Sequence, residues 1–275
     1  MVTESYLEQV SRLRGSSLLK HTDHCLWPVP SGPWVLAQTW HDLLFAHWPV
    51  PVDELRGLVP EGLHLDTYDG WAWVGVVPFR LSGLRVRGLP PFPYGSVFPE
   101  LNVRTYVTAG EKPGVWFFSL DAGNPLAVVA ARWSYFLPYF RARMSCDEAE
   151  GRIEYTSRRT HRGAPPGDFA GIYGPAGPIE LSEPGSLAHF LTERYCLYSV
   201  GPSGRIYRAN IHHLKWPLQS AEAELEVNTV ARAAGITLPP VAPLLHFARV
   251  LHMVTWLPEP VPSEELVSDA ADAST

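Results

Sequence analysis

The sequence has few of the residues on which several protein classes depend. Among 275 residues there are only three lysines, Lys20, Lys112 and Lys215, so any chemistry that needs an amine has three candidates. The three cysteines lie far apart without a CxxC pair, which argues against a disulfide framework. There is no run of eighteen apolar residues and no signal-peptide core at the start, so we expect a cytoplasmic protein without membrane spans.

Basic clusters and familiar catalytic motifs are missing as well. The net charge is −6 and no block of Lys and Arg occurs, so a nucleic-acid partner is not expected. GxSxG, P-loop, strand-associated GxGxxG and HExxH patterns are all absent. The hydrolase, nucleotide-binding and zinc-protease classes therefore have no motif support, and we expect a small-molecule ligand and no cofactor.

Aromatic residues, proline and glycine are abundant, which favours many strands joined by tight turns. Pro78 indicates a bulge or an edge in its strand. Residues 163–178 read as a loop, residues 186–199 begin as a helix, and residues 221–235 read as helical or irregular. The expected strands are 39–50, 71–84, 100–108, 115–121, 152–159, 205–216 and 245–257, and the expected helices are 3–14, 53–63 and 125–136.

These elements predict a mainly β (α+β) fold with a few short peripheral helices. No shift in composition or linker divides the chain, so we expect one domain over 21–257, a closed or strongly curved antiparallel β-barrel. Residues 1–20 would carry a helix in front of it. Residues 258–275 are acidic and Pro-punctuated, and we expect them to be disordered.

The strand FPELNVRTYV (98–107) carries an unusual polar face. With a period of two, it places Glu100, Asn102, Arg104 and Tyr106 on one side. A solvated face with cross-strand pairs is the simpler interpretation. The aromatic partner strand VWFFSLDA (115–122) instead favours burial of both faces, and a buried acid beside a buried guanidinium is often part of a site.

The histidines and a tyrosine supply further candidates. His212 and His213 are adjacent on a strand, so at most one can point inward, and His47 also lies on an expected strand. Tyr139 follows the helix-stopping Pro138 and can hold a phenol in place, although simple aromatic packing is an alternative. The segment HTDHC (21–25) resembles a set of metal ligands without matching a zinc motif, so an ordinary polar turn is the preferred interpretation and no metal is expected.

Eight motifs in one order, from about His47 to Trp256, resemble the YqjF-like family of bacterial proteins, a domain of unknown function (DUF2071). They are HWPVPVDELRGLVPEGLHLD, WAWVGVVPFR, FPELNVRTYV, GVWFFSLDA, LPYF, LTERYCLY, HHLKWPLQ and LLHFARVLHMVTW. That family is similar to the acetoacetate decarboxylase-like superfamily. The resemblance implies a curved β-barrel with a largely apolar cavity, and homo-oligomers are known among its decarboxylases.

The resemblance also implies a cavity position for Glu100, because FPE (98–100) is similar to the superfamily's aromatic-x-Glu step. The decarboxylases form a Schiff base through a lysine that follows a Gly-Phe-Pro step. In this sequence LPYF (137–140) takes that place, with Tyr139 and Phe140 where paired lysines would be. Acetoacetate decarboxylase activity is therefore not expected.

Three functions remain open. The preferred one is a lysine-independent enzyme of lyase, dehydratase, cyclase or isomerase type, acting on a small carbonyl-containing or aromatic molecule. Its catalytic residues would be Glu100 as general acid/base, Arg104 as anion holder and Tyr139 as donor to a carbonyl. The residues expected to bind the substrate are Asn102, His212 or His213, Trp116, Phe118, Tyr106 and His47. The alternatives are a ligand-binding or sensing protein without turnover, and a metal-dependent enzyme that uses HTDHC or the strand histidines.

Overall fold

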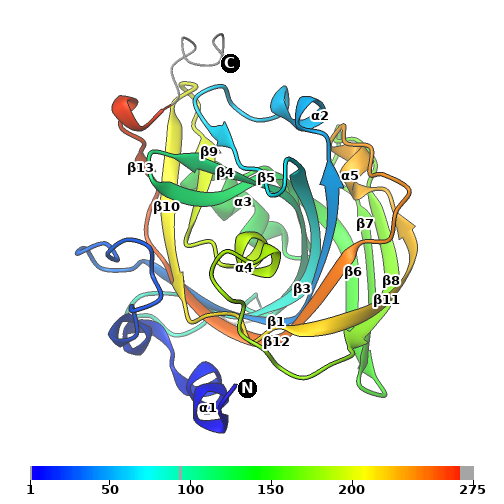
Figure 1. The fold of residues 1–275 in the computed structure, drawn as a ribbon, viewed down its shortest axis with the longest axis horizontal. Coiled ribbons are helices and arrows are strands. Elements are labelled where there is room, and N and C mark those ends of the chain that lie inside the picture. Colours follow the sequence, from blue (N-terminus) through cyan, green and yellow to red (C-terminus); the bar gives the residue numbers. More distant parts are fainter. Residues whose placement is uncertain (1, 93–94, 267–275) are drawn as a thin grey trace.

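The computed structural model describes residues 2–92 and 95–266, which consist mostly of strands with a few short helices (Figure 1). The strands are Leu36–Val50 (β1), His64–Leu65 (β2), Ala72–Val86 (β3), Phe98–Ala109 (β4), Lys112–Ala122 (β5), Tyr139–Ala149 (β6), Arg152–Arg159 (β7), Asp168–Pro175 (β8), Cys196–Val200 (β9), Ile206–His213 (β10), Gln219–Asn228 (β11), Leu244–Thr255 (β12) and Glu259–Pro260 (β13). The α-helices are Glu4–Arg12 (α1), Val52–Arg56 (α2), Pro125–Ser134 (α3), Leu187–Thr192 (α4) and Val230–Ala233 (α5). Two 3₁₀ helices cover Gly15–Lys20 (η1) and Ser263–Glu265 (η2). Within the described ranges, no helix is both long enough and apolar enough to cross a bilayer.

The strands form one hydrogen-bonded sheet whose pairing path returns to its first strand. Strand β5 pairs with β9, and the path continues through β10, β12, β1, β3 and β4 back to β5. A second branch, β6–β7–β8–β11, leaves at β5 and rejoins at β12. Figure 1 shows these strands curving around a common centre, with α4 inside their outline.

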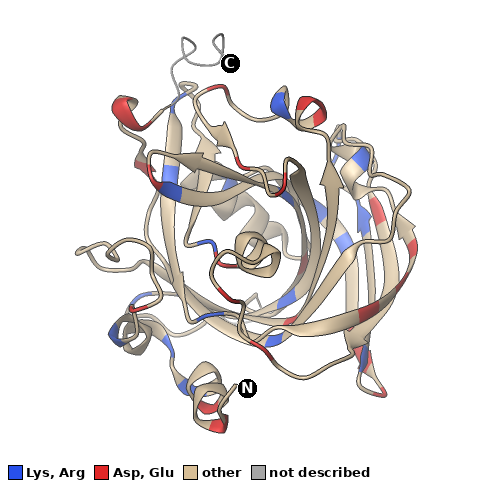
Figure 2. Ribbon diagram, viewed as in Figure 1, with Lys and Arg blue, Asp and Glu red and all other residues tan. Residues whose placement is uncertain are grey.

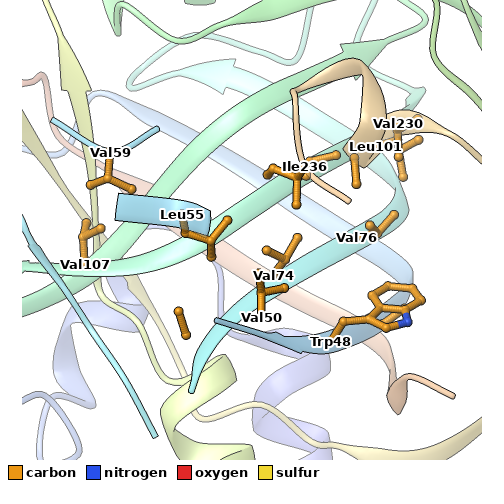
Figure 3. Packing of buried hydrophobic residues seen from close by; sticks show 14 of the residues in the cluster. Trp48, Val50, Leu55, Val59, Val74, Val76, Leu101, Val107, Val230 and Ile236 are labelled. Atoms are coloured by element: carbon orange, nitrogen blue, oxygen red, sulfur yellow. The ribbon is translucent and has the colours of Figure 1, made fainter. Parts of the chain in front are cut away.

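Strands β1, β3 and β4 are buried on both faces, and their period of two decides which residues point to which side. On β4, Leu101 and Val103 join the largest apolar cluster, together with Val74 and Val76 of β3. That cluster fills the space between these strands and α2, α5, β7 and β8, and Figure 3 shows a part of it. The other face of the same three strands is therefore free to line a cavity.

Several expectations from the sequence are confirmed. Strands β4 and β5 form the predicted hairpin, with Glu100 opposite Ala122 and Thr108 opposite Pro113. Helices α1 and α3 lie within the predicted ranges. Pro78 lies where the register between β1 and β3 shifts, so its missing N–H interrupts no ladder on that side.

Other expectations are wrong. Residues 168–175, expected in a loop, form β8. Of the stretch 221–235, expected to be helical or irregular, residues 221–228 belong to β11, and only Val230–Ala233 (α5) is helical. The predicted helix 53–63 ends as α2 at Arg56, and the chain continues into turns. Beyond residue 258, β13 and η2 replace the expected disorder up to residue 265, and residues 267–275 lie outside the described residues.

Candidate functional site

A cavity of about 410 Å³ lies on the free face of β1, β3 and β4. Its walls also include residues of α3, β5, β6, β10 and β12, and the lining is mostly apolar. Helix α3 contributes only small side chains, Ala127, Ala130, Ala131 and Ser134, and Tyr135 follows directly after the helix. Because the helical side chains are short, the helix forms a wall of the cavity without filling it.

Glu100 is the buried acid of this cavity. Only 4% of it is exposed, and burial raises the pKa of its carboxyl from 4.5 to about 8. The hydroxyl of Tyr139, on β6, donates a hydrogen bond to Oε2 at 3.0 Å and opposes that rise. The hydroxyl of Tyr155 donates to the backbone carbonyl of Glu100 at 2.7 Å, which fixes the strand behind the carboxyl. Glu100 is therefore mostly protonated at neutral pH.

Arg104 supplies the positive charge on the same wall. Its Nη2 donates a long hydrogen bond of 3.4 Å to the carbonyl of Leu191, and its guanidinium lies 5.2 Å from the ring centre of Phe45. Among the described residues no carboxylate forms an ion pair with it, and its buried Nε has no hydrogen-bond partner. Asn102, two residues earlier on the strand, likewise has a buried Oδ1 without a partner there. A buried donor and a buried acceptor on this strand are thus without a partner among the described residues.

The two strand histidines take opposite sides, as their adjacency requires. His213 lines the cavity, and burial lowers its pKa to about 3, so its imidazole is neutral. His212 points to the N-terminal segment, where its Nε2–H donates to the carbonyl of Leu18 at 3.0 Å.

Two tryptophans on the cavity wall were not among the sequence candidates. Trp40 and Trp216 stack with ring centres 5.6 Å apart and planes 4° from parallel, and His213 lies 5.3 Å from the second ring. Both indole Nε1 atoms are buried without a partner among the described residues. The imperfect alternation of residues 39–50, which predicts a strand, was the one sequence signal for Trp40. Trp216 lies 176 residues further along the chain, so no local pattern could link the two rings.

Four expected residues do not reach the cavity. Trp116 and Phe118 pack against the large apolar cluster, and Phe117 lines the cavity in their place. The reason is a bulge: Val103 pairs with Ser119 but Arg104 pairs with Phe117, which leaves Phe118 as the extra residue.

Tyr106 and His47 lie behind Arg104. Their side chains hydrogen-bond to each other at 2.6 Å, and the ring centre of Tyr106 is 5.6 Å from the Arg104 guanidinium. They support the wall rather than line it. Tyr139 does line the cavity, but its hydroxyl donates to Glu100, so the expected donation to a substrate carbonyl would require that bond to be exchanged.

No lysine lines the cavity. All three, Lys20, Lys112 and Lys215, belong to the described part of the chain, and none contributes to the lining. Lys and Arg residues and Asp and Glu residues are interspersed along the ribbon in Figure 2. Among the described residues, the walls offer one acid, two guanidinium groups (Arg104 and Arg194), two amides (Gln38 and Asn102), an imidazole and two indoles, and no amine.

The fold is that of the acetoacetate decarboxylase-like proteins. Acetoacetate decarboxylase from Legionella pneumophila matches with a TM-score of 0.55 at 12% identity, covering 94% of this chain and 98% of the other. An acetoacetate decarboxylase-like enzyme from Sphingomonas wittichii RW1 matches at 0.53 and 14% identity, over 89% and 98%. The enduracididine biosynthesis enzyme MppR, in complex with pyruvate, matches at 0.55 and 10% identity, over 88% and 94%. At these identities the likeness concerns the fold alone.

The chain belongs to the DUF2071 family, described as an uncharacterized conserved protein, whose model matches residues 37–252. The uncharacterized protein YqjF of Bacillus subtilis (strain 168) is 49% identical over 228 residues, which cover 83% of this chain and 93% of that protein. The resemblance predicted from the eight motifs is thereby confirmed.

Proposed function

We propose that this protein is a lysine-independent enzyme that moves protons on a small, largely apolar carbonyl compound with an acidic group. The observation that carries the proposal is the combination on one strand of a carboxyl that burial holds protonated and a guanidinium without a carboxylate partner among the described residues. An unpaired cation at an apolar wall is costly, so a ligand anion beside Arg104 would be stabilised. A group with a pKa of about 8 is well matched to general acid/base work near neutral pH.

The roles follow from the positions. In its carboxylate form, Glu100 takes a proton from the carbon next to the substrate carbonyl. The electron pair moves to the carbonyl oxygen, and the resulting enolate is stabilised by Arg104, whose planar cation suits two oxygens. Glu100 then returns the proton to a different atom, which is isomerisation, or to a departing hydroxyl, which is dehydration. Tyr139 positions the carboxyl throughout by its hydrogen bond.

Two further observations support this proposal. The closed pairing path through β5, β9, β10, β12, β1, β3 and β4 supports our interpretation of the cavity as the interior of a barrel. MppR, with the same fold, is described in complex with pyruvate, a short keto acid, and this supports keto acids as the first compounds to try.

A ligand-binding protein without turnover is the alternative, favoured by the mostly apolar lining. An ion pair between Glu100 and Arg104, in which the two charges compensate each other, would also favour the non-catalytic alternative. No such pair occurs among the described salt bridges, and burial raises the pKa of Glu100 instead of a cation lowering it.

The test separates binding from proton transfer. Pyruvate, phenylpyruvate and their methyl esters are offered to the protein in deuterated water, with binding followed by calorimetry and exchange at the carbon beside the carbonyl followed by NMR. We expect the acids to bind more tightly than the esters and the wild type to exchange their protons. Glu100→Gln should bind the same acid and lose the exchange, whereas Arg104→Met should lose the preference for the acid.

Matched variants on exposed surfaces serve as controls. Glu154→Gln on β7 and Arg143→Met on β6 make the same chemical changes at exposed positions and should behave as wild type.

On α3, Ala131→Phe projects a ring into the cavity, and Val129→Phe, on the outer side of the helix, does not. Binding without exchange in the wild type would support the non-catalytic alternative, and equal binding to Ala131→Phe and wild type would place the ligand outside the cavity.

A further inference from the structure

A cluster of three metal-ligating residues lies outside the cavity, on the opposite face of β10. His24 and Cys25 come from the segment between η1 and β1, and His212 comes from the end of β10. One ligand atom from each lies within 4.8 Å of the other two. Figure 1 shows this N-terminal segment, in dark blue, beside β10, and the bond from His212 to Leu18 of η1 agrees.

The hydrogen bonds of the two imidazoles leave one ring nitrogen of each with a free lone pair. His212 Nε2 lies 3.0 Å from the carbonyl oxygen of Leu18, and His24 Nε2 lies 2.7 Å from that of His213. A carbonyl only accepts, so each Nε2 carries the proton and each Nδ1 presents its lone pair. Metal-binding histidines are oriented in this way, with the second ring nitrogen donating to a backbone carbonyl or a carboxylate.

The spacing of the sulfur and the nearer imidazole already fits a bound ion. Cys25 Sγ lies 3.4 Å from His212 Nδ1. In a tetrahedral zinc site with bonds of roughly 2.0–2.3 Å, two ligand atoms are about 3.3–3.8 Å apart. Cys25 and His212 therefore need no rearrangement. The His24 nitrogen that lies 3.9 Å from Cys25 Sγ is Nε2, which donates to the carbonyl of His213. His24, whose ring stacks on that of His212 at 5.6 Å, is therefore the ligand that must rearrange, by turning its ring so that Nδ1 faces the ion.

We propose that His24, Cys25 and His212 form a binding site for a thiolate-preferring divalent metal ion of the zinc type. Two imidazoles and one thiolate suit Zn²⁺, and three protein ligands leave a fourth position for water or another small donor. His24 and Cys25 are only partly buried, so an ion can enter from solvent, whereas His212 is fully buried and fixes the geometry. The ion would join the N-terminal segment to β10. This proposal is independent of the function proposed for the cavity.

The experiment uses the full chain after treatment with a chelator, followed by titration with Co²⁺ and displacement by Zn²⁺. We expect one equivalent of Co²⁺ to produce a thiolate-to-cobalt charge-transfer band with the intense visible absorption of a tetrahedral site. Cys25→Ser should abolish the band, and His212→Gln should weaken Zn²⁺ binding by at least about tenfold, because loss of a ligand costs no less than loss of its supporting hydrogen bond.

Two substitutions and one chemical measurement make the test selective. His21→Gln, in the same HTDHC segment but outside the cluster, and Cys146→Ser, at another partly buried thiol, should bind as wild type does. In the wild-type protein, Zn²⁺ should also protect Cys25, and not Cys146, from alkylation as mapped by mass spectrometry. The proposal is overturned if the wild type shows no thiolate band, if Zn²⁺ does not protect Cys25, or if binding is substoichiometric and equal in all variants, which would indicate an adventitious ion only.

Discussion

The buried carboxyl of Glu100 should make the stability of this protein fall as the pH rises. Its pKa in the folded state is about 8, against an ordinary value of 4.5, because burial disfavours the carboxylate. Between these two values the folded protein holds a proton that the unfolded chain has released, so stability decreases with pH. The two pKa values differ by about 3.5 units, and each unit corresponds to about 1.4 kcal/mol. The free energy of unfolding should therefore fall by about 5 kcal/mol in total across this pH range.

Glu100→Gln isolates this effect, because the amide copies the shape of the protonated acid and does not titrate. We expect the free energy of unfolding of the wild type to fall by about 2.5 kcal/mol relative to that of the variant between about pH 5 and about pH 7. The measurement is urea denaturation, monitored by tryptophan fluorescence, at several pH values across this range. Other buried acids, such as Glu193, are present in both proteins, so their titration cancels in the difference.

The exposed Glu154→Gln variant is the matched control, and its difference from wild type should not change with pH. The reasoning about Glu100 would be refuted by a wild-type-minus-Glu100→Gln difference that stays constant, within about 0.5 kcal/mol, over the same range. Such a result would mean that water or a local opening reaches the carboxyl and keeps its pKa near the ordinary value. The general acid proposed for the cavity would then have lost its physical basis.

Three other outcomes are expected. Tyr139→Phe removes the donor that stabilises the carboxylate of Glu100, so the pH profile of proton exchange should move to higher pH, and an unchanged profile would count against the bond. Asp121→Asn should cost about 3–5 kcal/mol in denaturant unfolding, because it leaves the buried guanidinium of Arg159 without its charge partner at 2.7 and 3.0 Å. Acetoacetate should lose CO₂ no faster than in buffer, and borohydride should trap no adduct by mass spectrometry, since no lysine lines the cavity.

The polar face of β4 was predictable in part from local information. Alternation places Glu100, Asn102 and Arg104 on one side, but a solvated face remained an alternative, and the family resemblance, rather than periodicity, favoured the cavity. The structure brings all three to the cavity. The adjacency of His212 and His213 likewise required opposite orientations, and only the packing of the N-terminal segment decides which one faces inward.

Strand β11 was missed because residue propensity and periodicity disagree in QSAEAELEVN. Ala, Glu and Leu favour helices in isolation. The exposed glutamates alternate with partly buried apolar residues at every second position over most of the strand, which is the period of a half-buried strand. Pairing with β8 and β12 then outweighs propensity.

The direction of Trp116 and Phe118 depended on a feature that single strands do not reveal. The register shift at Val103 and Arg104 turns the partner strand so that Phe117 lines the cavity. A bulge is set by how two strands fit their twist and packing to each other, so neither strand alone specifies it. The stacking of Trp40 on Trp216 was also not predictable from one segment, because it joins two residues that are distant in the sequence.

The residues at the cavity wall restrict where negative charge can accumulate during a reaction. A Schiff base draws electrons into an iminium nitrogen, but this wall offers no amine for it. In the proposed reaction, negative charge that develops on a bound carbonyl compound would therefore stay on oxygen, where the guanidinium of Arg104 would stabilise it. An enolate forms only when a base removes the proton from carbon and a cation stabilises the negative oxygen. The proposed reaction would therefore need Glu100 and Arg104 together. A variant lacking either one should thus fail at exchange about as completely as a variant lacking both.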